Sequence, residues 1–273
     1  MKNIYILRTH KWNAKIEQNF STFLSMENAY VVHDDTRNKE YPAGCEVRCF
    51  NSNVNEHPNE RYLLVNEKEC KQTNPLHSSL WEHPNTLLEI LANYFEPLDY
   101  DHMWVVEYDV YCHGDWKSCL LACDGKTEDF LATELKEYPQ SRAWYHWKTK
   151  PLFKVGKSIK PPVLNECIKC FFPVTRYSKR FLRHLNEKRG HCIAFCEIYV
   201  PTICKLNAFT IGDVEKEIIG SYFSYSSWKD KNKTLHLPFD NRLYHPDKWQ
   251  LCWARPKKDK NPFKHKRMNI TTL

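Results

Sequence analysis

Apolar positions in the first part of the chain form short runs of strand type, separated by two segments with helical spacing. The strand-type runs cover residues 3–8, 29–35, 61–67 and 101–111, and a further short strand is expected at 45–50. Residues 15–26 and 85–95 instead repeat apolar positions every three or four residues, which predicts two amphipathic helices. This alternation of strands and helices predicts an α/β sheet with parallel members.

The second half of the chain contains more loops and fewer clear patterns. A turn or helix is expected at 115–124, and residues 128–135 fit either a short helix or an edge strand. One apolar face repeats through 175–190, which predicts a helix that ends at Gly190. We find no internal repeat and no low-complexity segment in the chain.

Two carboxylates stand at the end of the most apolar strand, in the segment MWVVEYDVYCHGD at 103–115. Glu107 and Asp109 are two positions apart, so in a strand they project from the same face and repel each other unless a cation is shared. A hard divalent ion such as Mg²⁺ or Mn²⁺ accepts carboxylate oxygens and bridges to a diphosphate. The other interpretation is that one acid is exposed and the second caps the turn at Gly114.

Acids also follow the strand-type run at 29–35, where Asp34 and Asp35 close the segment. Ligands of parallel α/β sheets bind at the carboxyl ends of the strands. We therefore expect the acids of the two runs to border one ligand site.

The charge of the chain changes this picture only slightly. The formal net charge is +7, and part of it lies in the basic segment 256–267. That segment is either a solvated tail or a surface for nucleic acid or membrane, and we expect no nucleic-acid partner. No apolar stretch is long enough for a membrane span. The first residues read as a strand rather than a signal peptide, and the 12 cysteines form no regular framework, so a cytoplasmic location with reduced thiols is expected.

Four segments carry a resemblance to a known group of proteins. They are WVVEYDVYCHGDW at 104–116, EDFLAT at 128–133 followed by WYHW at 144–147, FFPVTRYSKRFL at 171–182 leading to CEIYVPT at 196–202, and LYHPDK at 243–248. In this order they resemble glycosyltransferase-like proteins of large algal viruses, the chlorella viruses among them, and of some algae and plants. Within that group the chain looks like a xylosyltransferase of capsid glycan synthesis.

The resemblance implies a single GT-A-like domain over 1–273. Its parts would be a nucleotide-sugar and metal-binding half at 1–125, an acceptor-binding half at 126–255 and the basic tail at 256–273. It also implies a nucleotide-sugar donor, specifically UDP-xylose, a glycan or glycoprotein acceptor, and Mn²⁺ or Mg²⁺. A viral protein of this kind would act in the host cytoplasm.

Roles for individual residues follow from the same resemblance. The group's usual motif is Asp-x-Asp, and Glu107 stands in its first position, which leaves the need for a metal open. The implied metal ligands are Asp109, Glu107 and His245. The implied donor contacts are Leu7, Arg8, Thr9, Asp34, Glu107, His245 and Lys248, with Arg8 and Lys248 suited to phosphate.

Transfer to a sugar hydroxyl with inversion requires a general base. Glu197 is the first candidate, because it lies in the apolar run 192–206, where a lone carboxylate is costly unless it is used or paired. It could equally face solvent from an edge strand. Asp129 is the second candidate, as base or as a hydrogen-bond acceptor for the acceptor sugar. The aromatic side chains at 144–147, Trp144, Tyr145 and Trp147, either stack on sugar rings or pack in the core.

Other functions remain open on the residues alone. A structural zinc site would use Cys167, Cys170, Cys192, Cys196 and the adjacent His191. A carbohydrate-binding module without catalysis would also explain the many aromatic residues, and a metal-dependent phosphoester hydrolase would also use paired acids, with His33 as a further ligand. A Gly-rich phosphate loop and a GxSxG nucleophile motif are both absent.

Overall fold

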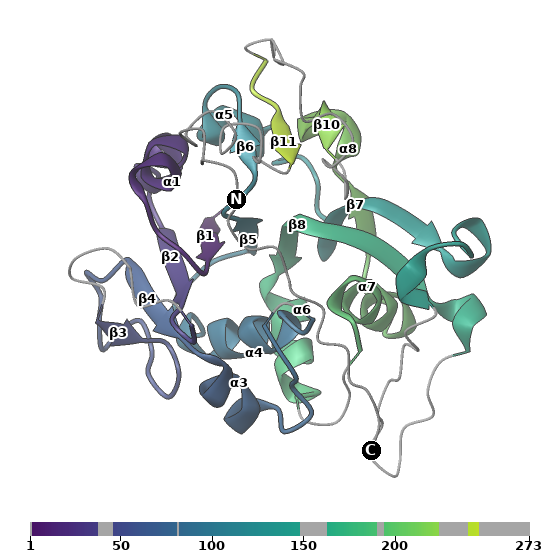
Figure 1. Ribbon diagram of the computed structural model, residues 1–273, viewed down its shortest axis with the longest axis horizontal. Coiled ribbons are helices and arrows are strands. Elements are labelled where there is room, and N and C mark those ends of the chain that lie inside the picture. The colour runs from purple at the N-terminus through teal and green to yellow at the C-terminus, as the bar shows by residue number, and fades with distance from the viewer. Residues whose placement is uncertain are drawn as a thin grey trace, which may run out of the picture.

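The structure is a computed structural model that describes residues 2–37, 46–80, 82–147, 163–189, 194–223 and 240–245. In these ranges the chain forms a large mixed sheet with helices on both faces and a smaller sheet beside it (Figure 1). The predicted α/β class is thus confirmed. The basic tail at 256–273 and Lys248 lie outside the described residues.

The large sheet has eight strands in the order β3-β4-β2-β1-β5-β8-β7-β9. Their bounds are β1 Asn3–Thr9, β2 Ala29–Asp34, β3 Val47–Arg48, β4 Tyr62–Val65, β5 His102–Glu107, β7 Phe130–Glu137, β8 Ile168–Ser178 and β9 Ile211–Asp213. Strand β1 pairs in parallel with β2 on one side and with β5 on the other. The chain therefore builds outward from β1 to β4 and then returns to the opposite side of β1, which creates a topological switch point between β1 and β5.

Helices cover both faces of this sheet. They are α1 Ala14–Asn19, α2 Ser21–Leu24, α3 Glu67–Thr73, α4 Asn85–Tyr94, α5 Trp116–Leu121, α6 Lys179–Glu187, α7 Cys196–Leu206 and α8 Glu215–Ile218. The strands and helices predicted in the first 124 residues are present at or near their predicted positions, but the segment 15–26 is split into α1 and α2. The run expected as one strand at 101–111 is likewise split into β5 and β6, with Asp109 in a turn between them. Helix α3 was not predicted, and its N-terminus is set by a capping box between Asn66 and Glu69.

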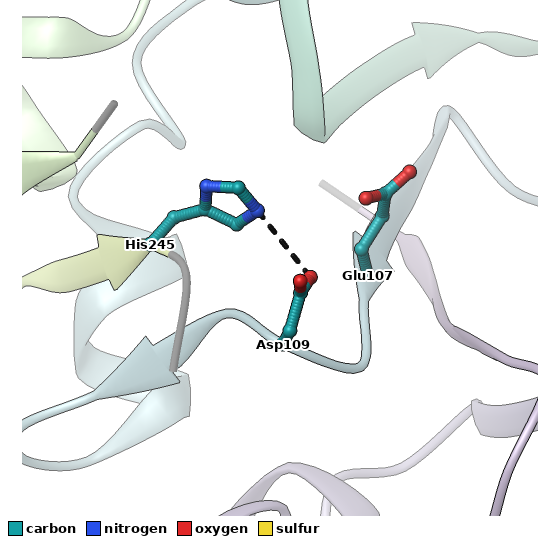
Figure 2. A group of neighbouring side chains, drawn as sticks. All are labelled: Glu107, Asp109 and His245. Atoms are coloured by element: carbon teal, nitrogen blue, oxygen red, sulfur yellow. Dashed lines mark ion pairs between the residues drawn. The ribbon is translucent and has the colours of Figure 1, made fainter. Parts of the chain in front are cut away.

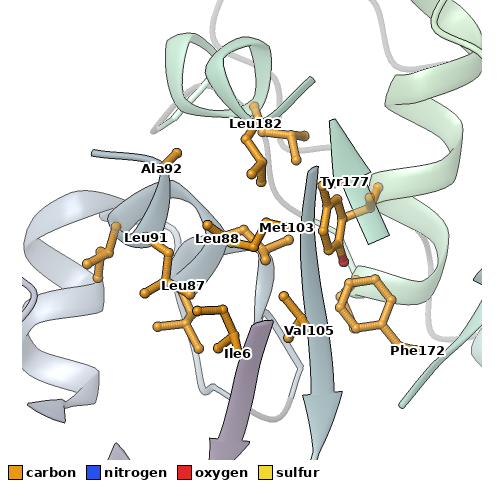
Figure 3. Packing of buried hydrophobic residues seen from close by; sticks show 14 of the residues in the cluster. Ile6, Leu87, Leu88, Leu91, Ala92, Met103, Val105, Phe172, Tyr177 and Leu182 are labelled. Atoms are coloured by element: carbon orange, nitrogen blue, oxygen red, sulfur yellow. The ribbon is translucent and has the colours of Figure 1, made fainter. Parts of the chain in front are cut away.

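Alternate residues of β1 and β5 face two separate cores, as expected for strands that are buried on both faces. Ile6 and Val105 pack against α4 and α6 in the core of Figure 3. Leu7 and Trp104 pack on the other face, in the core that includes α1, α2 and α5. Because both faces of β1 and β5 are buried, nearly every position along these strands is apolar, which explains their continuous apolar runs in the sequence.

The region 175–190 differs from its prediction. Residues up to Ser178 belong to β8 and pair antiparallel with β5, and only Lys179–Glu187 is helical. Ser178 is the N-cap, because its hydroxyl oxygen accepts the Phe181 N–H at 3.2 Å. Tyr177 and Phe181 are both fully buried, so a strand-to-helix junction gave the same apolar spacing as one helix. Residues 128–135, open between helix and strand, lie mostly in β7.

A second sheet of three strands, in the order β10-β11-β6, stands beside the first (Figure 1). Its strands are β6 Tyr111–Cys112, β10 Ile219–Phe223 and β11 Leu243–His245. Strand β6 follows β5 directly in the chain, whereas β10 and β11 come from the C-terminal part. The small sheet therefore carries C-terminal residues to the end of β5.

No helix among the described residues is long and apolar enough to cross a membrane. The nine cysteines in the described part of the chain are all buried and free of disulfides.

Asp129 lies where β7 begins, and 2% of its side chain is exposed. Its carboxylate accepts hydrogen bonds from Arg180, from the Ser178 hydroxyl at 2.7 Å and from the Thr210 N–H at 3.0 Å. Burial alone would raise the pKa of Asp129, but these hydrogen bonds outweigh it and lower the pKa to about 2. The network ties β7 to α6 and to the segment before β9.

We expect Asp129→Asn to lower the free energy of unfolding at pH 7 by about 1–3 kcal/mol, because the amide cannot hold these donors as the carboxylate does. Since the folded pKa of Asp129 is depressed from 3.8 to about 2, its contribution is complete above the unfolded value and disappears as the pH falls toward 2. Urea unfolding of the wild type and the variant at about pH 7, 4 and 3 measures this loss of stability, since these pH values lie on both sides of the unfolded pKa of an Asp. Asp99→Asn, at a side chain that is 86% exposed, is the matched control, and equal midpoints for both variants at pH 7 would contradict the structural role.

Candidate active site at the carboxyl ends of β1 and β5

A cavity of about 940 Å³ opens at the switch point of the large sheet. Its floor is formed by the carboxyl ends of three parallel strands, with Arg8 and Thr9 from β1, Asp34 from β2 and Glu107 from β5. Strand β8, helix α7 and strand β11 contribute to its walls. Of the strand-end acids expected to lie together, Asp34 and Glu107 line this cavity, whereas Asp35 is buried and paired with Arg48 at 2.6 Å.

Glu107, Asp109 and His245 form the group of possible metal ligands that the described residues bring together (Figure 2). One ligand atom from each residue lies within 4.8 Å of the others. Glu107 ends β5, and a turn closed by the Val110 N–H on the Glu107 carbonyl, at 3.1 Å, presents Asp109. His245 ends β11 and places Nε2 3.3 Å from Asp109 Oδ1. The small sheet thus completes a cluster that β5 begins.

The chemistry of this cluster fits a divalent cation. Two carboxylates and one imidazole are ligands that suit Mn²⁺, and the oxygens also suit Mg²⁺. The three side chains are 26%, 18% and 10% exposed, so they are sheltered but open to the cavity. The replacement of the first Asp of an Asp-x-Asp motif by Glu107 therefore leaves a donor set that a metal can use.

Arg8 lies on the other side of Glu107. The two residues are register partners on β1 and β5, and Arg8 Nη1 is 3.2 Å from Glu107 Oε1. The second guanidinium nitrogen donates to the Leu80 carbonyl at 3.2 Å. Burial raises the pKa of Glu107 above its usual value, and the Asp109 charge adds to this, whereas Arg8 opposes it. Arg8 therefore places a fixed positive charge beside the metal candidates.

The cavity end nearest β1 and β2 is lined by basic and polar groups that were not predicted. His10 and Lys11 follow β1, and both contact the ring of Tyr108, at 4.7 Å between ring centroids and 4.6 Å from Nζ to the centroid. Arg37 lines the same end. The sequence did contain a signal, because RTHK continues directly from the first strand and Tyr108 lies between the two acids.

The opposite end of the cavity is aromatic and contains Glu197. This residue lies in the first turn of α7, is 6% exposed and accepts the Phe172 N–H at 3.3 Å. Burial raises its pKa to about 8, against the effect of the Phe172 hydrogen bond. His146 stacks on Phe195 with 4.1 Å between ring centroids, and both line the cavity. Glu197 thus faces the cavity from a buried helix rather than solvent from an edge strand.

Several predicted residues lie elsewhere. Leu7 is fully buried in the core on the α1 side, because alternate residues of β1 point to opposite faces, so its side chain does not border the cavity. Asp129 is held in the network described above and is not a cavity residue. Trp147 is 4% exposed in the core with Trp144 packed against it, whereas Tyr145 is 68% exposed.

The zinc hypothesis finds no support among the described residues. Cys167, Cys170 and Cys196 are buried, but they do not form a cluster of ligands in the described part of the chain. Cys192 and His191 lie outside the described residues.

The sequence matches no family model and no curated protein. Among solved structures it is similar to the galactosyltransferase LgtC in complex with donor and acceptor sugar analogues, at 11% identity over 88% of this chain and 82% of that chain, with a TM-score of 0.39. Mouse xyloside xylosyltransferase 1 is similar at 9% identity over 89% and 97% of the two chains, with a TM-score of 0.40. For S. aureus TarS residues 1–349 the identity is 12%, the TM-score is 0.37, and the match covers 78% of this chain but 58% of that chain. Likenesses this weak carry no argument about the activity of this chain.

Proposed function

We propose that the protein is a metal-assisted glycosyltransferase that moves a sugar from a nucleotide-sugar donor to a glycan or glycoprotein acceptor. The observation that carries the proposal is the position of the cluster of Glu107, Asp109 and His245. It lies in the cavity at the switch point of the sheet, between a basic end and an aromatic end that contains a buried carboxyl group. A charged donor and a neutral sugar can therefore meet at the cluster.

The donor fits the basic end and the centre of the cavity. The cavity volume of about 940 Å³ lies at the upper end of the roughly 300–1,000 Å³ of ligand pockets, which suits a nucleotide diphosphate with an attached sugar. Arg8 offers a guanidinium to diphosphate oxygens next to Glu107, and Lys11 adds a second positive charge above the Tyr108 ring. Thr9 and Asp34 lie where the nucleoside would reach the strand ends.

Asp109, Glu107 and His245 would hold Mn²⁺ or Mg²⁺, which neutralises the negative charge that builds on a departing diphosphate. Arg8 opposes the burial-driven rise in the pKa of Glu107 and holds its carboxylate through their 3.2 Å ion pair, and it binds the diphosphate from the strand side. The Asp109 carboxylate keeps the His245 ring turned toward the cluster through its 3.3 Å contact. Lys248, in the element after His245, remains a proposed phosphate contact.

The acceptor fits the aromatic end. Phe171, Phe195 and His146 present ring faces and edges of the kind on which sugar rings pack, and Glu197 lies among them. In the proposed reaction the Glu197 carboxylate takes the proton of an acceptor hydroxyl. The hydroxyl oxygen forms the bond to the anomeric carbon as the bond from that carbon to the diphosphate breaks, and the configuration inverts.

Xylose as the sugar and UDP-xylose as the donor rest on the resemblance of the sequence segments alone, as does a role in viral capsid glycan synthesis. The competing hypothesis of a phosphoester hydrolase is less favoured, because enzymes of that kind commonly pair two metals, and the described residues form one metal cluster.

Removing the charge of Asp109 tests the metal site. We expect Asp109→Asn to lower turnover about 100- to 1,000-fold, because a group that stabilises the departing diphosphate is lost. Thermal unfolding with UDP, GDP, UDP-xylose and other nucleotide-sugars, each with Mn²⁺, Mg²⁺ or EDTA, measures binding separately, since a ligand of the folded state raises Tm. In the wild type one nucleotide class should raise Tm only with a metal, and Asp109→Asn should abolish that metal-dependent part.

Asp99→Asn serves as the control, because this acid is 86% exposed and precedes the start of β5, whereas the cluster lies at the carboxyl end of that strand. Full activity of Asp109→Asn would show that the metal assignment is wrong. A nucleotide-dependent rise in Tm that EDTA leaves unchanged would keep the transferase and remove the metal from its mechanism.

Glu197→Gln tests the base. We expect turnover to fall about 100- to 10,000-fold while the affinity for the donor nucleotide stays the same. Because only the carboxylate accepts a proton, the wild-type kcat/KM should rise with pH up to about 8, the pKa of Glu197, and this rise should disappear in the variant.

Stability supplies a second measurement. The folded pKa of Glu197 is raised from 4.5 to about 8, so the wild type loses stability as the pH rises between these values. Glu197→Gln, which mimics the neutral form, should therefore unfold at a higher temperature than the wild type above pH 8. Glu27→Gln, at an exposed position, is the control. Weak donor binding with normal turnover in Glu197→Gln would place this residue at the donor instead.

A further inference from the structure

The segment GDW at 114–116 is conspicuous in the sequence, and the proposed reaction assigns it no role. It follows β6, which pairs antiparallel with β11 so that Cys112 lies opposite Leu243. His245 is two residues beyond Leu243, at the end of the same strand. The contacts that hold β11 to residues 112–115 therefore determine where His245 stands.

Gly114 and Asn241 form the closest of these contacts. A Cβ atom at Gly114 would lie 2.1 Å from Asn241 Oδ1 and 2.9 Å from Asn241 Cα, so no other residue fits without displacing Asn241. Gly114 also has a φ of 157°, a conformation that favours glycine. The close approach lets Asn241 Oδ1 accept the Asp115 N–H at 2.9 Å.

Further hydrogen bonds continue this contact toward the cluster. The Asn241 N–H donates to the His113 carbonyl at 3.3 Å, and the His113 N–H donates to the Arg242 carbonyl at 3.1 Å. Asn241 itself has a φ of 52°, which turns the chain into β11. On the far side, Arg242 Nη1 donates to the Ile219 carbonyl at 2.8 Å, which ties the turn to β10.

Asp115 anchors the other partner of the contact. Its carboxylate caps α5 by accepting the Ser118 N–H at 2.7 Å, and the fully buried Trp116 stacks on Phe20. Residues 114–116 are therefore held in place by α5 and by the packing of Trp116 on Phe20. Residues 240–245 come from a part of the chain that is distant in sequence. The contact between Gly114 and Asn241 joins these two segments, and it can therefore set the position of His245, four residues after Asn241.

We propose that Gly114 and Asn241 form a clamp that positions His245 against Asp109 and so completes the metal site. The proposal rests on the proposed function, because it assumes that the cluster of Glu107, Asp109 and His245 binds a divalent cation. Gly114 and Asn241 are positioning residues, because neither is one of the three candidate ligands and neither lines the cavity. On this proposal the role of the GDW segment is to position His245, the metal ligand that β11 supplies.

Affinity for Mn²⁺ alone tests this without any substrate. Isothermal titration of the full chain should show weaker binding for Gly114→Ala, by about 10- to 100-fold, as is typical when a group that orients a metal ligand is lost. Gly125→Ala is the matched control, because a Cβ there would meet nothing within 4 Å, and it should bind Mn²⁺ as the wild type does.

A double-mutant cycle with His245→Ala separates positioning from general damage. If the clamp acts through His245, Gly114→Ala should cause no further loss of Mn²⁺ affinity once His245 is absent. Asn241→Gly is a milder second variant in case Gly114→Ala does not fold. The glycine accommodates the φ of 52° at this position and removes the acceptor for the Asp115 N–H. Asn241→Gly should therefore weaken Mn²⁺ binding when His245 is present and cause no further loss in the His245→Ala protein. Thermal unfolding without metal reports whether each variant folds.

The outcomes separate the clamp from the function on which it rests. Losses that appear with His245 present and vanish in its absence support the clamp. Unchanged affinity of a folded Gly114→Ala protein, or an equal loss in both backgrounds, overturns the clamp and leaves the metal site intact. A wild type that binds no Mn²⁺, or whose binding is unaffected by Asp109→Asn and His245→Ala, overturns the metal site and the clamp together.

Discussion

The parallel pairing of β1 with both β2 and β5 is the constraint on which the rest of the structure depends. It brings the carboxyl ends of three strands to one edge and, because the chain returns across β1, leaves a crevice between β1 and β5. Arg8 and Glu107 are register partners across this crevice. A shift of one residue in the pairing of β1 with β5 would place the two side chains on opposite faces of the sheet and so separate them.

Charge balance in the cavity explains how so many acids can share it. Glu107 and Asp109 lie two positions apart at a turn, and the Asp109 charge raises the pKa of Glu107. Arg8 supplies one positive charge within ion-pair distance, and the imidazole of His245 lies against Asp109. Glu197 stands apart in an apolar environment, where burial raises its pKa to about 8, so that its ionised form is a stronger base than an ordinary carboxylate. The two groups of acids thus have different environments, which suits one to binding a cation and the other to accepting a proton.

The site also depends on parts of the chain that are distant in sequence. Strand β8 runs antiparallel to β5 and leads into α6, so that its aromatic residues and the first turn of α7 close one wall. The small sheet closes the other wall by pairing β11 with β6. Because β6 follows β5 almost directly, its pairing with β11 brings His245 to Glu107 and Asp109, although β11 lies more than a hundred residues later in the chain.

The sequence by itself determined the α/β class, the strands and helices of the first 124 residues other than α3, and the pair Glu107 and Asp109, because apolar periodicity and strand-end acids are local signals. The same signals misplaced the start of α6, since a buried strand that enters a helix spaces its apolar residues as a longer helix does. The position of Glu197 on a buried helix, the burial of Leu7 and the separate network of Asp129 were decided by tertiary packing. So was the meeting of His245 with Asp109, because it depends on the pairing of β11 with β6, and no local pattern encodes a contact between segments so far apart.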